Sequence, residues 1–328
     1  MGGASRLAIF LRRRFLHGIL VVLCIVLINF GLLHLAPGDV AQVMAGESGG
    51  ADAGYVEQLR ARFGLDRPLP VQLGYYLLGL AKLDLGYSFR NSASVLELIS
   101  ARVPATLLLM SAAIGFAVLG GVILGIVAAR RAGTIVDHAV ALISLLSYAT
   151  PLFWLGLMLI VLFSVKLRWL PTGGMMTVGE EMSFLRATQD LALHTAMPAV
   201  TLGLFYMAVY TRLVRASLIE IAEMDFVRTA RAKGLAPGPL MRRHILRNAM
   251  LPLVTMLGVQ VGSVVGGAVV VETVFGWPGL GRLAFDAILA RDLNLMLGIL
   301  LISSVLVVVT NTLVDLAYAW LDPRIELG

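Results

Sequence analysis

Six long runs of apolar residues divide the chain, with polar segments between them. A transmembrane helix needs about 20 mostly apolar residues, because each residue rises about 1.5 Å through a hydrocarbon core about 30 Å thick. The pattern therefore predicts an all-α integral membrane protein with six transmembrane helices. The runs are Phe15–Ala36, Pro104–Ala129, a span within Val136–Val165, Met197–Leu218, Leu251–Val274 and Leu295–Leu321.

Prolines mark two places where the helix bounds are informative. Pro104 opens the second run, and a proline costs little at the first helical position because that N–H has no partner in the helix. Pro151 interrupts the third run and is expected to kink or end a helix there. The third run fits one tilted helix, or a short interfacial helix followed by a span. We favour a short helix over Ile135–Ser147 that joins the main span near Pro151.

The distribution of charge predicts the orientation in the membrane. With the N-terminus inside, the inner segments carry 15 Lys and Arg residues against six acidic ones, whereas the outer segments carry 11 against 13. This is the positive-inside pattern, so both termini are expected to be cytoplasmic. The first run exceeds the usual apolar length of a signal peptide, about 7–15 residues, and is expected to be retained. The resulting segments are a cytoplasmic N-terminus (1–14), a first transmembrane helix (15–36), an extracytoplasmic segment (37–103) and a transmembrane core (104–328) with a cytoplasmic loop over 219–250.

Composition narrows the class of protein. Hydrophobic residues make up 59% of the chain and charged residues 14%, against about 45–50% and 25% in soluble domains. A soluble domain and a disordered chain are both excluded. The single cysteine, Cys24, excludes a disulfide framework or a cysteine-built metal site. The net charge of +6 is accounted for by basic cytoplasmic loops, so no nucleic-acid partner is expected.

The sequence shows no enzyme motif. A phosphate loop of the form G-x-x-x-x-G-K-[ST] is absent, so no ATP site of that type is expected, and H-E-x-x-H and G-x-S-x-G are absent as well. The five histidines are scattered near span ends, where a structural role is the favoured interpretation. Ion-coupled transport needs ionisable groups within the spans. Asp315 is such a group, but we favour a polar helix-end pair with Asn311, four residues earlier.

Small residues form a strip on the fifth run. Gly258, Gly262 and Gly266 recur every four residues, which places them on one helix face and lets another helix approach closely. Ordinary helix packing and the lining of a pathway both fit this strip, and the sequence leaves the two open. Gln260 is the strongly polar side chain in the middle of that run. The weak pathway candidates are Gln260, Gly262, Ser263 and Gly266.

The basic loop between the fourth and fifth runs has a helical pattern. Residues 225–233 are mostly good helix formers, and Gly234 follows them as an expected C-cap. A second helical stretch begins at Pro239 and continues into the fifth run. A loop that only fixes topology needs positive charges but not a compact helix–Gly–helix unit. We therefore favour a docking element for a cytoplasmic partner.

Several motifs give this chain a family resemblance. The stretch Asp225-Phe-Val-Arg-Thr-Ala-Arg-Ala-Lys-Gly-Leu235 resembles the cytoplasmic coupling loop of binding-protein-dependent ABC importer permeases, and it is most similar to the first permease subunit of the dipeptide/oligopeptide/nickel group. In the wider class this loop reads Glu-Ala-Ala, three residues and Gly, and here Arg228, Thr229 and Ala230 take the first three places. The other matching stretches begin at Leu35 (LAPGD), Phe63 (FGLDRP), Asp84 (DLGYS), Tyr148 (YATPLFW), Glu272 (ETVFGWPGLG) and Asp322 (DPR).

The resemblance implies an architecture and partners. It implies a permease in the bacterial or archaeal cytoplasmic membrane that forms half of a translocation pathway. Its partners would be a homologous second permease, two cytoplasmic ATPase subunits, an extracytoplasmic solute-binding protein and membrane lipid. ATP and Mg would be bound by the ATPase subunits, with no cofactor in this chain. The residues implied in ATPase coupling are Asp225, Arg228, Thr229, Ala230, Arg231, Ala232, Lys233 and Gly234.

The resemblance leaves the substrate open. Peptides are the first expectation, and nickel, glutathione-like and opine-like ligands occur in the same group. The alternative function is an ion-coupled secondary transporter without ATPase partners, and a third is an assembly protein without transport. The basic loop and the scarcity of charge within the spans favour the importer.

Overall fold

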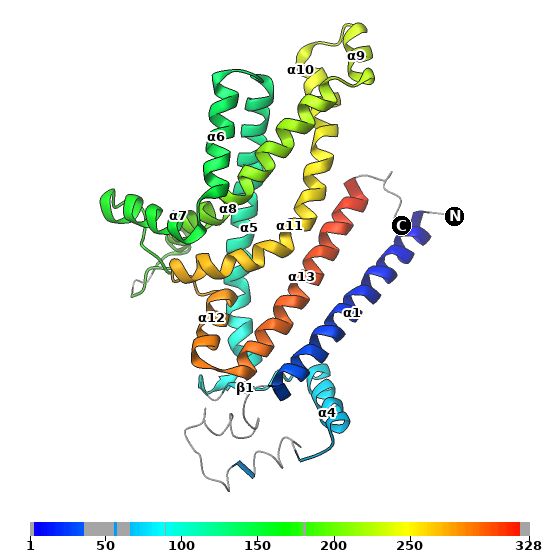
Figure 1. Cartoon of the computed structure of the whole chain (residues 1–328). Coiled ribbons are helices and arrows are strands. Elements are labelled where there is room, and N and C mark those ends of the chain that lie inside the picture. Colours follow the sequence, from blue (N-terminus) through cyan, green and yellow to red (C-terminus); the bar gives the residue numbers. More distant parts are fainter. Residues whose placement is uncertain (1–2, 36–55, 58–65, 89, 180–181, 322–328) are drawn as a thin grey trace. The chain divides into compact units, whose positions relative to one another are not determined.

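The computed structural model describes residues 3–35, 56–57, 66–88, 90–179 and 182–321. These residues are mostly helical, and one short β-hairpin is present among them. Two compact units divide the chain: unit 1 holds residues 1–104, 282–313 and 322–328, and unit 2 holds residues 105–281 and 314–321. Each unit is described separately below, with the element labels of Figure 1.

Unit 1 contains long helices and the hairpin. The helices are α1 (Gly3–Leu35), α4 (Leu69–Ala81), the first turns of α5 (Val95–Arg130), most of α12 (Leu280–Ala290) and much of α13 (Leu293–Leu321). Strands β1 (Tyr87–Ser88) and β2 (Ala93–Ser94) pair antiparallel, with Tyr87 opposite Ser94. Much of the expected extracytoplasmic segment, residues 36–55 and 58–65, lies outside the described residues.

Buried polar side chains join the elements of unit 1. Asp292 caps α13, because its Oδ1 accepts a hydrogen bond from the backbone N–H of Leu295 (3.0 Å). Its other oxygen accepts a hydrogen bond from the Ser88 hydroxyl on β1. Asn29 of α1 donates to the carbonyl of Leu297 on α13 (3.2 Å). These bonds fix α1 and the hairpin against the start of α13.

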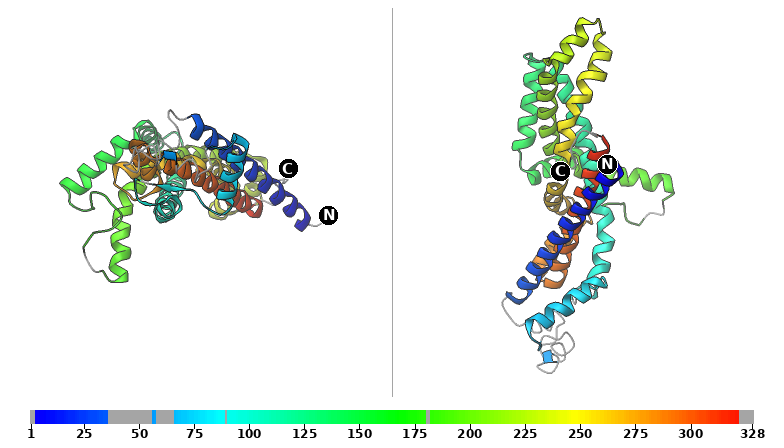
Figure 2. Two further views of the ribbon diagram at one scale, coloured as in Figure 1. Left: turned by 90° about the horizontal axis from the view of Figure 1, so that it is seen from below. Right: turned by 90° about the vertical axis from the view of Figure 1, so that its right-hand side faces the viewer.

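Unit 2 is a helical bundle. Its helices are the rest of α5, α6 (Ile135–Ala149), α7 (Leu152–Leu159), α8 (Phe184–Ala222), α9 (Asp225–Ala232), α10 (Pro237–Pro239) and α11 (Arg247–Val274), with π-helical segments η1 (Ile160–Lys166) and η2 (Leu240–Leu246). Helices α6 and α11 both pack against α8, and the views of Figures 1 and 2 agree on this arrangement. The core contains Leu202, Tyr210 and Val214 of α8 and extends to Val271 and Phe275.

Glycines of α5 allow α8 to approach closely. A Cβ atom on Gly121 would lie 2.6 Å from the Cβ of Tyr210, and one on Gly125 would lie 2.7 Å from the Cβ of Val214. Real side chains do not approach so closely, so these positions require glycine or a shift of the helices. The contact is the close backbone approach that small residues permit in membrane helices.

Threonines of α8 satisfy their hydroxyl groups within the same helix. Thr201 donates to the carbonyl of Met197 (2.8 Å), and Thr211 donates to the carbonyl of Met207 (2.8 Å). Both are buried. A buried hydroxyl must find a partner, and the carbonyl four residues earlier supplies one. The buried part of α8 therefore presents little unsatisfied polarity to its neighbours.

The third apolar run is broken at Pro151, as expected. Helix α6 ends at Ala149, and α7 begins at Leu152 with Pro151 as its N-cap. The two helical arms, Ile135–Ala149 and Leu152–Lys166, are bent by 106°. Pro151 cannot donate a backbone hydrogen bond and so cannot continue α6. The favoured prediction of a short helix from Ile135 that joins a second helix near Pro151 is confirmed, and the alternative of one tilted helix is not.

The start of α5 corrects one expectation. Pro104 was expected to open the second transmembrane helix, but it lies inside α5, which begins at Val95. The Ser94 hydroxyl accepts a hydrogen bond from the backbone N–H of Glu97 (3.2 Å). Ser94 is therefore the N-cap residue of α5, and it lies ten residues before Pro104. The first turns of α5 include polar residues, and for this reason the apolar pattern did not mark them as part of the helix.

The stretch that follows α11 forms a buried corner. The indole Nε1 of Trp277, 0% exposed, donates to the carbonyl of Ala105 (2.9 Å). The hydroxyl of Thr106 donates to Oε1 of the buried Glu272 (2.7 Å) and accepts from the backbone N–H of Leu280 (2.8 Å). A Cβ on Gly279 would clash with the carboxylate of Glu272, so a larger residue there would force that buried side chain to shift. The corner ties the end of α11 to α5.

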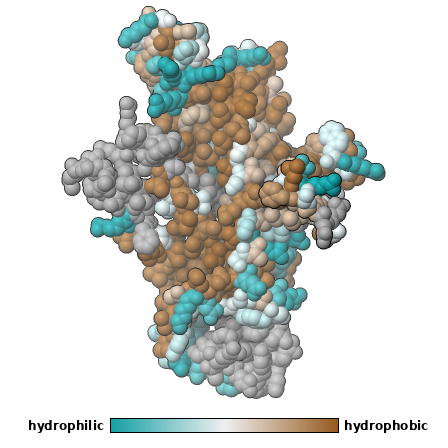
Figure 3. All heavy atoms as spheres, turned by 180° about the vertical axis from the view of Figure 1, so that it is seen from behind, coloured by the Kyte–Doolittle hydropathy of each residue, from teal (hydrophilic) through white to brown (hydrophobic). Residues whose placement is uncertain are grey.

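The apolar helices support a membrane location. Among the described residues, three helices are long and apolar enough to cross a membrane, and the bent pair would make a fourth. The three are α5, α8 and Leu293–Leu313 of α13. Brown, hydrophobic side chains cover much of the molecular face in Figure 3, whereas teal, hydrophilic ones gather at the tip that carries α9.

Candidate functional site

The candidate coupling loop is the segment from Met224 to Leu235, between α8 and the run that leads into α11. Helix α9 forms its centre and is eight residues long. Figure 1 shows α9 and α10 at the tip of the two long helices α8 and α11, at the same end of unit 2 as the turn between α5 and α6. The expected helix over 225–233 and the expected second helical stretch are both present, although the second begins at Pro237 rather than Pro239.

Gly234 ends α9 in a left-handed conformation, with φ of +80°. The backbone N–H of Leu235 donates to the carbonyl of Ala230 (3.2 Å), and that of Gly234 donates to the carbonyl of Arg231 (3.0 Å). This pair of bonds is a Schellman motif, which satisfies carbonyls at the helix end. A residue with a Cβ adopts this conformation at a cost of about 1–2 kcal/mol. The expected C-cap role of Gly234 is confirmed.

The coupling loop has a face that packs inward. Val227 is fully buried, and Ala230 is half-buried against the hydrophobic core of unit 2. Ala230 therefore has a packing role within its own chain. The other residues that the sequence implicated are exposed: Asp225, Arg228, Thr229, Arg231, Ala232, Lys233 and Gly234.

Exposed apolar side chains occur in the same loop, and sequence reasoning did not single them out. Met224, Phe226 and Leu235 are all large and exposed. The available signal was the apolar residue Phe226 beside Val227, together with the apolar residues Met224 and Leu235 that flank the predicted helix. Such side chains can be buried by a partner, and aromatic and methionine residues are enriched in the cores of interfaces.

The cations of the coupling loop have little intramolecular engagement. Arg228 pairs with Asp225 at 3.6 Å, but both side chains are largely exposed. An exposed pair of this kind contributes about 0–1 kcal/mol. Arg231 and Lys233 make no ion pair with a residue that the structure describes. The loop thus presents positive charge and apolar surface together.

A partly buried ion pair connects α6 to α8, the helix that leads into the coupling loop. Arg215 of α8 donates two hydrogen bonds to the carboxylate of Asp137 at the start of α6, at 2.6 and 2.7 Å. Asp137 also accepts a hydrogen bond from the backbone N–H of Gly133 (2.9 Å). A bidentate pair fixes geometry as well as charge. In the sequence analysis Asp137 and Arg215 only contributed to the charge count, because nothing in their sequence positions indicates that the two side chains form an ion pair.

The weak pathway candidates lie in α11. Gln260 is buried, and its Oε1 has no hydrogen-bond partner among the described residues. The surroundings of Gly262, Ser263 and Gly266, and the side chain of Asp315, lie outside what the structure describes. A pathway role for these four α11 positions stays a prediction.

Family models match almost the whole chain. The model described as "Binding-protein-dependent transport system inner membrane component" matches residues 121–327. A second model, for the N-terminal part of such membrane components, matches residues 7–110. The first match alone covers more than half of the chain and includes the coupling loop.

Curated relatives agree with the family match. The di/tripeptide transport system permease protein DppB of Pseudomonas aeruginosa (strain UCBPP-PA14) is 39% identical over 320 residues, which is 92% of this chain and 94% of the relative. The oligopeptide transport system permease protein AppB of Bacillus subtilis (strain 168) is 38% identical over 322 residues, 98% of this chain and 100% of the relative.

A solved structure shares the fold. The fold is similar to that of a chain of the MetNI methionine ABC transporter in an inward-facing conformation, with a TM-score of 0.54, 20% identity, and coverage of 69% of this chain and 96% of that chain. That likeness concerns the helical fold, and the family rests on the sequence matches. With nearly every residue matched, the chain belongs to the family of binding-protein-dependent transport system inner membrane components.

Proposed function

We propose that this chain is one of two homologous permease subunits of an ATP-driven importer that carries peptides across the bacterial cytoplasmic membrane. The relatives named above are permeases for dipeptides, tripeptides and oligopeptides, and this supports peptides as the substrate class. Two ATPase subunits bind and hydrolyse ATP with Mg, and an extracytoplasmic binding protein delivers the peptide. The chain itself has no ATP site.

The coupling loop supports the link to an ATPase subunit. Helix α9 is short, ends in a Schellman motif and lies at the tip of two long helices. Ala232 permits a close approach, while Phe226 and Met224 offer apolar contact area. Shape and apolar contact should outweigh charge here, because exposed ion pairs contribute about 0–1 kcal/mol each. This exposed, well-capped helix is the observation that carries the proposal.

Coupling is expected to fail when the docking surface is obstructed. Ala232→Trp should reduce ATPase activity stimulated by the peptide-loaded binding protein about ten-fold or more, because an overpacked contact costs about 1–3 kcal/mol. Arg231→Ala should change it less than three-fold. The measurement is ATP hydrolysis by the reconstituted importer in liposomes. Ala232 is preferred to Ala230 as the test position because Ala230 packs inside its own unit.

A matched control keeps this test specific. Ala132, exposed in the turn between α5 and α6, lies at the same end of unit 2 but outside the coupling loop. Ala132→Trp should leave stimulated hydrolysis near the wild-type rate. Full stimulation in an assembled Ala232→Trp complex would show that the loop does not dock. Peptide uptake driven by an ion gradient without ATP would instead favour a secondary transporter.

The proposal includes six transmembrane helices with both termini in the cytoplasm, which rests on the charge asymmetry of the loops. In a Cys24→Ser background, a cysteine at Val178, which is 95% exposed, should react with a membrane-impermeant maleimide added outside intact cells. Cysteines at Ala132 and Arg231 should react only after the membrane is permeabilised. Labelling of position 231 from outside would contradict this topology.

A further inference from the structure

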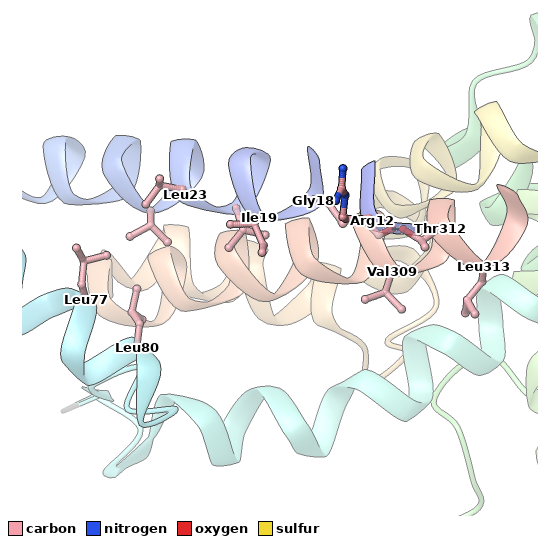
Figure 4. A pocket seen from close by; sticks show the side chains of 12 residues that line it. Arg12, Gly18, Ile19, Leu23, Leu77, Leu80, Val309, Thr312 and Leu313 are labelled. Atoms are coloured by element: carbon pink, nitrogen blue, oxygen red, sulfur yellow. Dashed lines mark hydrogen bonds between the residues drawn. The ribbon is translucent and has the colours of Figure 1, made fainter. Parts of the chain in front are cut away.

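Unit 1 contains an apolar groove of about 860 Å³ between α1, α4 and α13. Its lining is almost entirely aliphatic, and each of the three helices contributes to it. Figure 4 shows the side chains along the groove, which include Ile19 and Leu23 of α1, Leu77 and Leu80 of α4, and Val309 and Leu313 of α13.

One cation lies at one end of this groove. Arg12 is close to Thr312 in Figure 4, whereas Leu77 and Leu80 lie at the other end. Arg12 is exposed, and within the described part of the chain its side chain has no hydrogen bond or ion pair. The Thr312 hydroxyl donates to the carbonyl of Val308 (2.8 Å) and is satisfied within α13. The guanidinium is therefore available to an anion at the mouth of an apolar groove.

The dimensions of the groove follow from helix geometry. Its lining on α1 runs from Arg12 to Val26, and the fourteen rises of about 1.5 Å between these residues span about 21 Å. One leaflet contributes about half of a hydrocarbon core about 30 Å thick. At Gly18 a Cβ would lie 2.8 Å from the Cγ1 of Val308, so α1 and α13 touch there. Along α1 the groove therefore extends for somewhat more than the thickness of one leaflet.

The position of Arg12 in the sequence places the cation at the membrane surface. The long apolar run of α1 begins at Phe15, directly after Arg12, Arg13 and Arg14. Arg12 thus lies at the border between headgroups and hydrocarbon, whichever side the N-terminus faces. The apolar lining extends from this border toward the membrane interior.

A lipid fits this groove better than a helix of a partner protein. A helix about 10 Å across and 20 Å long occupies roughly 1,600 Å³, about twice the volume of the groove. An acyl chain is thinner than a helix. Helix association in membranes also favours small residues at the contact, whereas the groove is lined mainly by Leu, Ile and Val.

We propose that this groove binds the acyl chain of an anionic phospholipid, with the lipid phosphate held by Arg12. Basic pockets between transmembrane helices bind anionic headgroups in this way. The site is separate from the coupling loop, and its chemistry does not depend on the transported substrate. It would make phospholipid a component of the assembled permease.

The test compares bound lipids by mass. Purified importer complex is equilibrated with equal amounts of phosphatidylglycerol and phosphatidylcholine of identical acyl chains, and retained lipids are counted by native mass spectrometry. Wild type should retain phosphatidylglycerol about five-fold over phosphatidylcholine, the preference given by one basic residue near an anionic headgroup. Arg12→Gln should remove the preference, and Arg12→Lys should keep most of it.

Two further variants distinguish lipid binding in the groove from a general effect of removing a positive charge. Arg131→Gln removes an exposed arginine outside the groove and should leave the preference unchanged. Leu23→Trp partly fills the groove and should lower retention of both lipids. The proposal is overturned if Arg12→Gln keeps the wild-type preference, or if Arg131→Gln loses it equally. It is also overturned if a photoreactive residue at Val309 cross-links the second permease rather than lipid. ATPase stimulation, measured in parallel, reports on the transport function independently.

Discussion

Replacement of Trp277 by alanine is expected to destabilise the permease by about 3–5 kcal/mol, the range for truncation of a buried tryptophan or phenylalanine. The indole is fully buried and bonded to the carbonyl of Ala105, so the variant loses both packing and a hydrogen bond. The corner after α11 should loosen from α5. The measurement is thermal unfolding of the purified complex in detergent, followed by the loss of monodisperse protein.

Two matched variants show whether the loss of stability in Trp277→Ala comes from burial or from the hydrogen bond. Trp169→Ala removes an indole that is 67% exposed and should cost less than 1 kcal/mol. Trp277→Phe keeps most of the volume but loses the donor, and should cost about 0.5–1.5 kcal/mol for the hydrogen bond in addition to the volume change. Equal melting temperatures for Trp277→Ala and Trp169→Ala would show that the corner does not contribute to stability.

Removal of Arg215 is expected to cost about 2–3 kcal/mol and to weaken coupling. Arg215→Ala leaves the buried carboxylate of Asp137 with one backbone donor, Gly133. Breaking a fully buried pair costs about 3–5 kcal/mol, and the side chain of Arg215 is 36% exposed, so we expect a smaller value. Since α8 leads directly into the coupling loop, stimulated ATP hydrolysis should fall together with the unfolding temperature.

A double-mutant cycle tests whether the two residues act as a pair. Asp137→Ala combined with Arg215→Ala should be less destabilising than the sum of the single changes by about 0.5–3 kcal/mol, because the double variant leaves no buried charge unpaired. Arg131→Ala, an exposed arginine near the same turn, should lie within about 0.5 kcal/mol of wild type. Additive effects would contradict the bracing role.

Local sequence signals predicted the helix ends well where one residue sets them. Pro151 broke the third run because a proline lacks the donor that continues a helix. Gly234 ended α9 because the Schellman motif needs a left-handed residue. The expected start of α5, at Pro104, lies nine residues after its observed start at Val95, because the cap at Ser94 lies in a polar stretch that the apolar pattern did not include. Helix α4 was not predicted, although Pro68 is its N-cap residue and Pro70 lies in its first turn, where a proline costs little.

Contacts between distant residues were not predictable from the pattern. Asp137 and Arg215 are 78 positions apart, and Thr106 and Glu272 are 166 apart. No local sequence motif indicates either pair, because the two residues of each pair come together only when the helices pack. The same holds within the coupling loop. The family resemblance implied Ala230 as a contact, whereas in the structure Ala230 packs inward and Phe226 and Met224 are exposed.

The contact between α5 and α8 has a consequence for movement. In the part of the chain that the structure describes, no hydrogen bond joins these two helices across the contact of Gly121 and Gly125, and the threonines of α8 bond to their own backbone. Small sliding displacements would therefore break no directional bond and expose no new polar group. Sliding of α5 along α8 is therefore opposed by side-chain packing and not by hydrogen bonds. Helices joined in this way can slide slightly past one another without losing a hydrogen bond, which suits a protein that must alternate between two states.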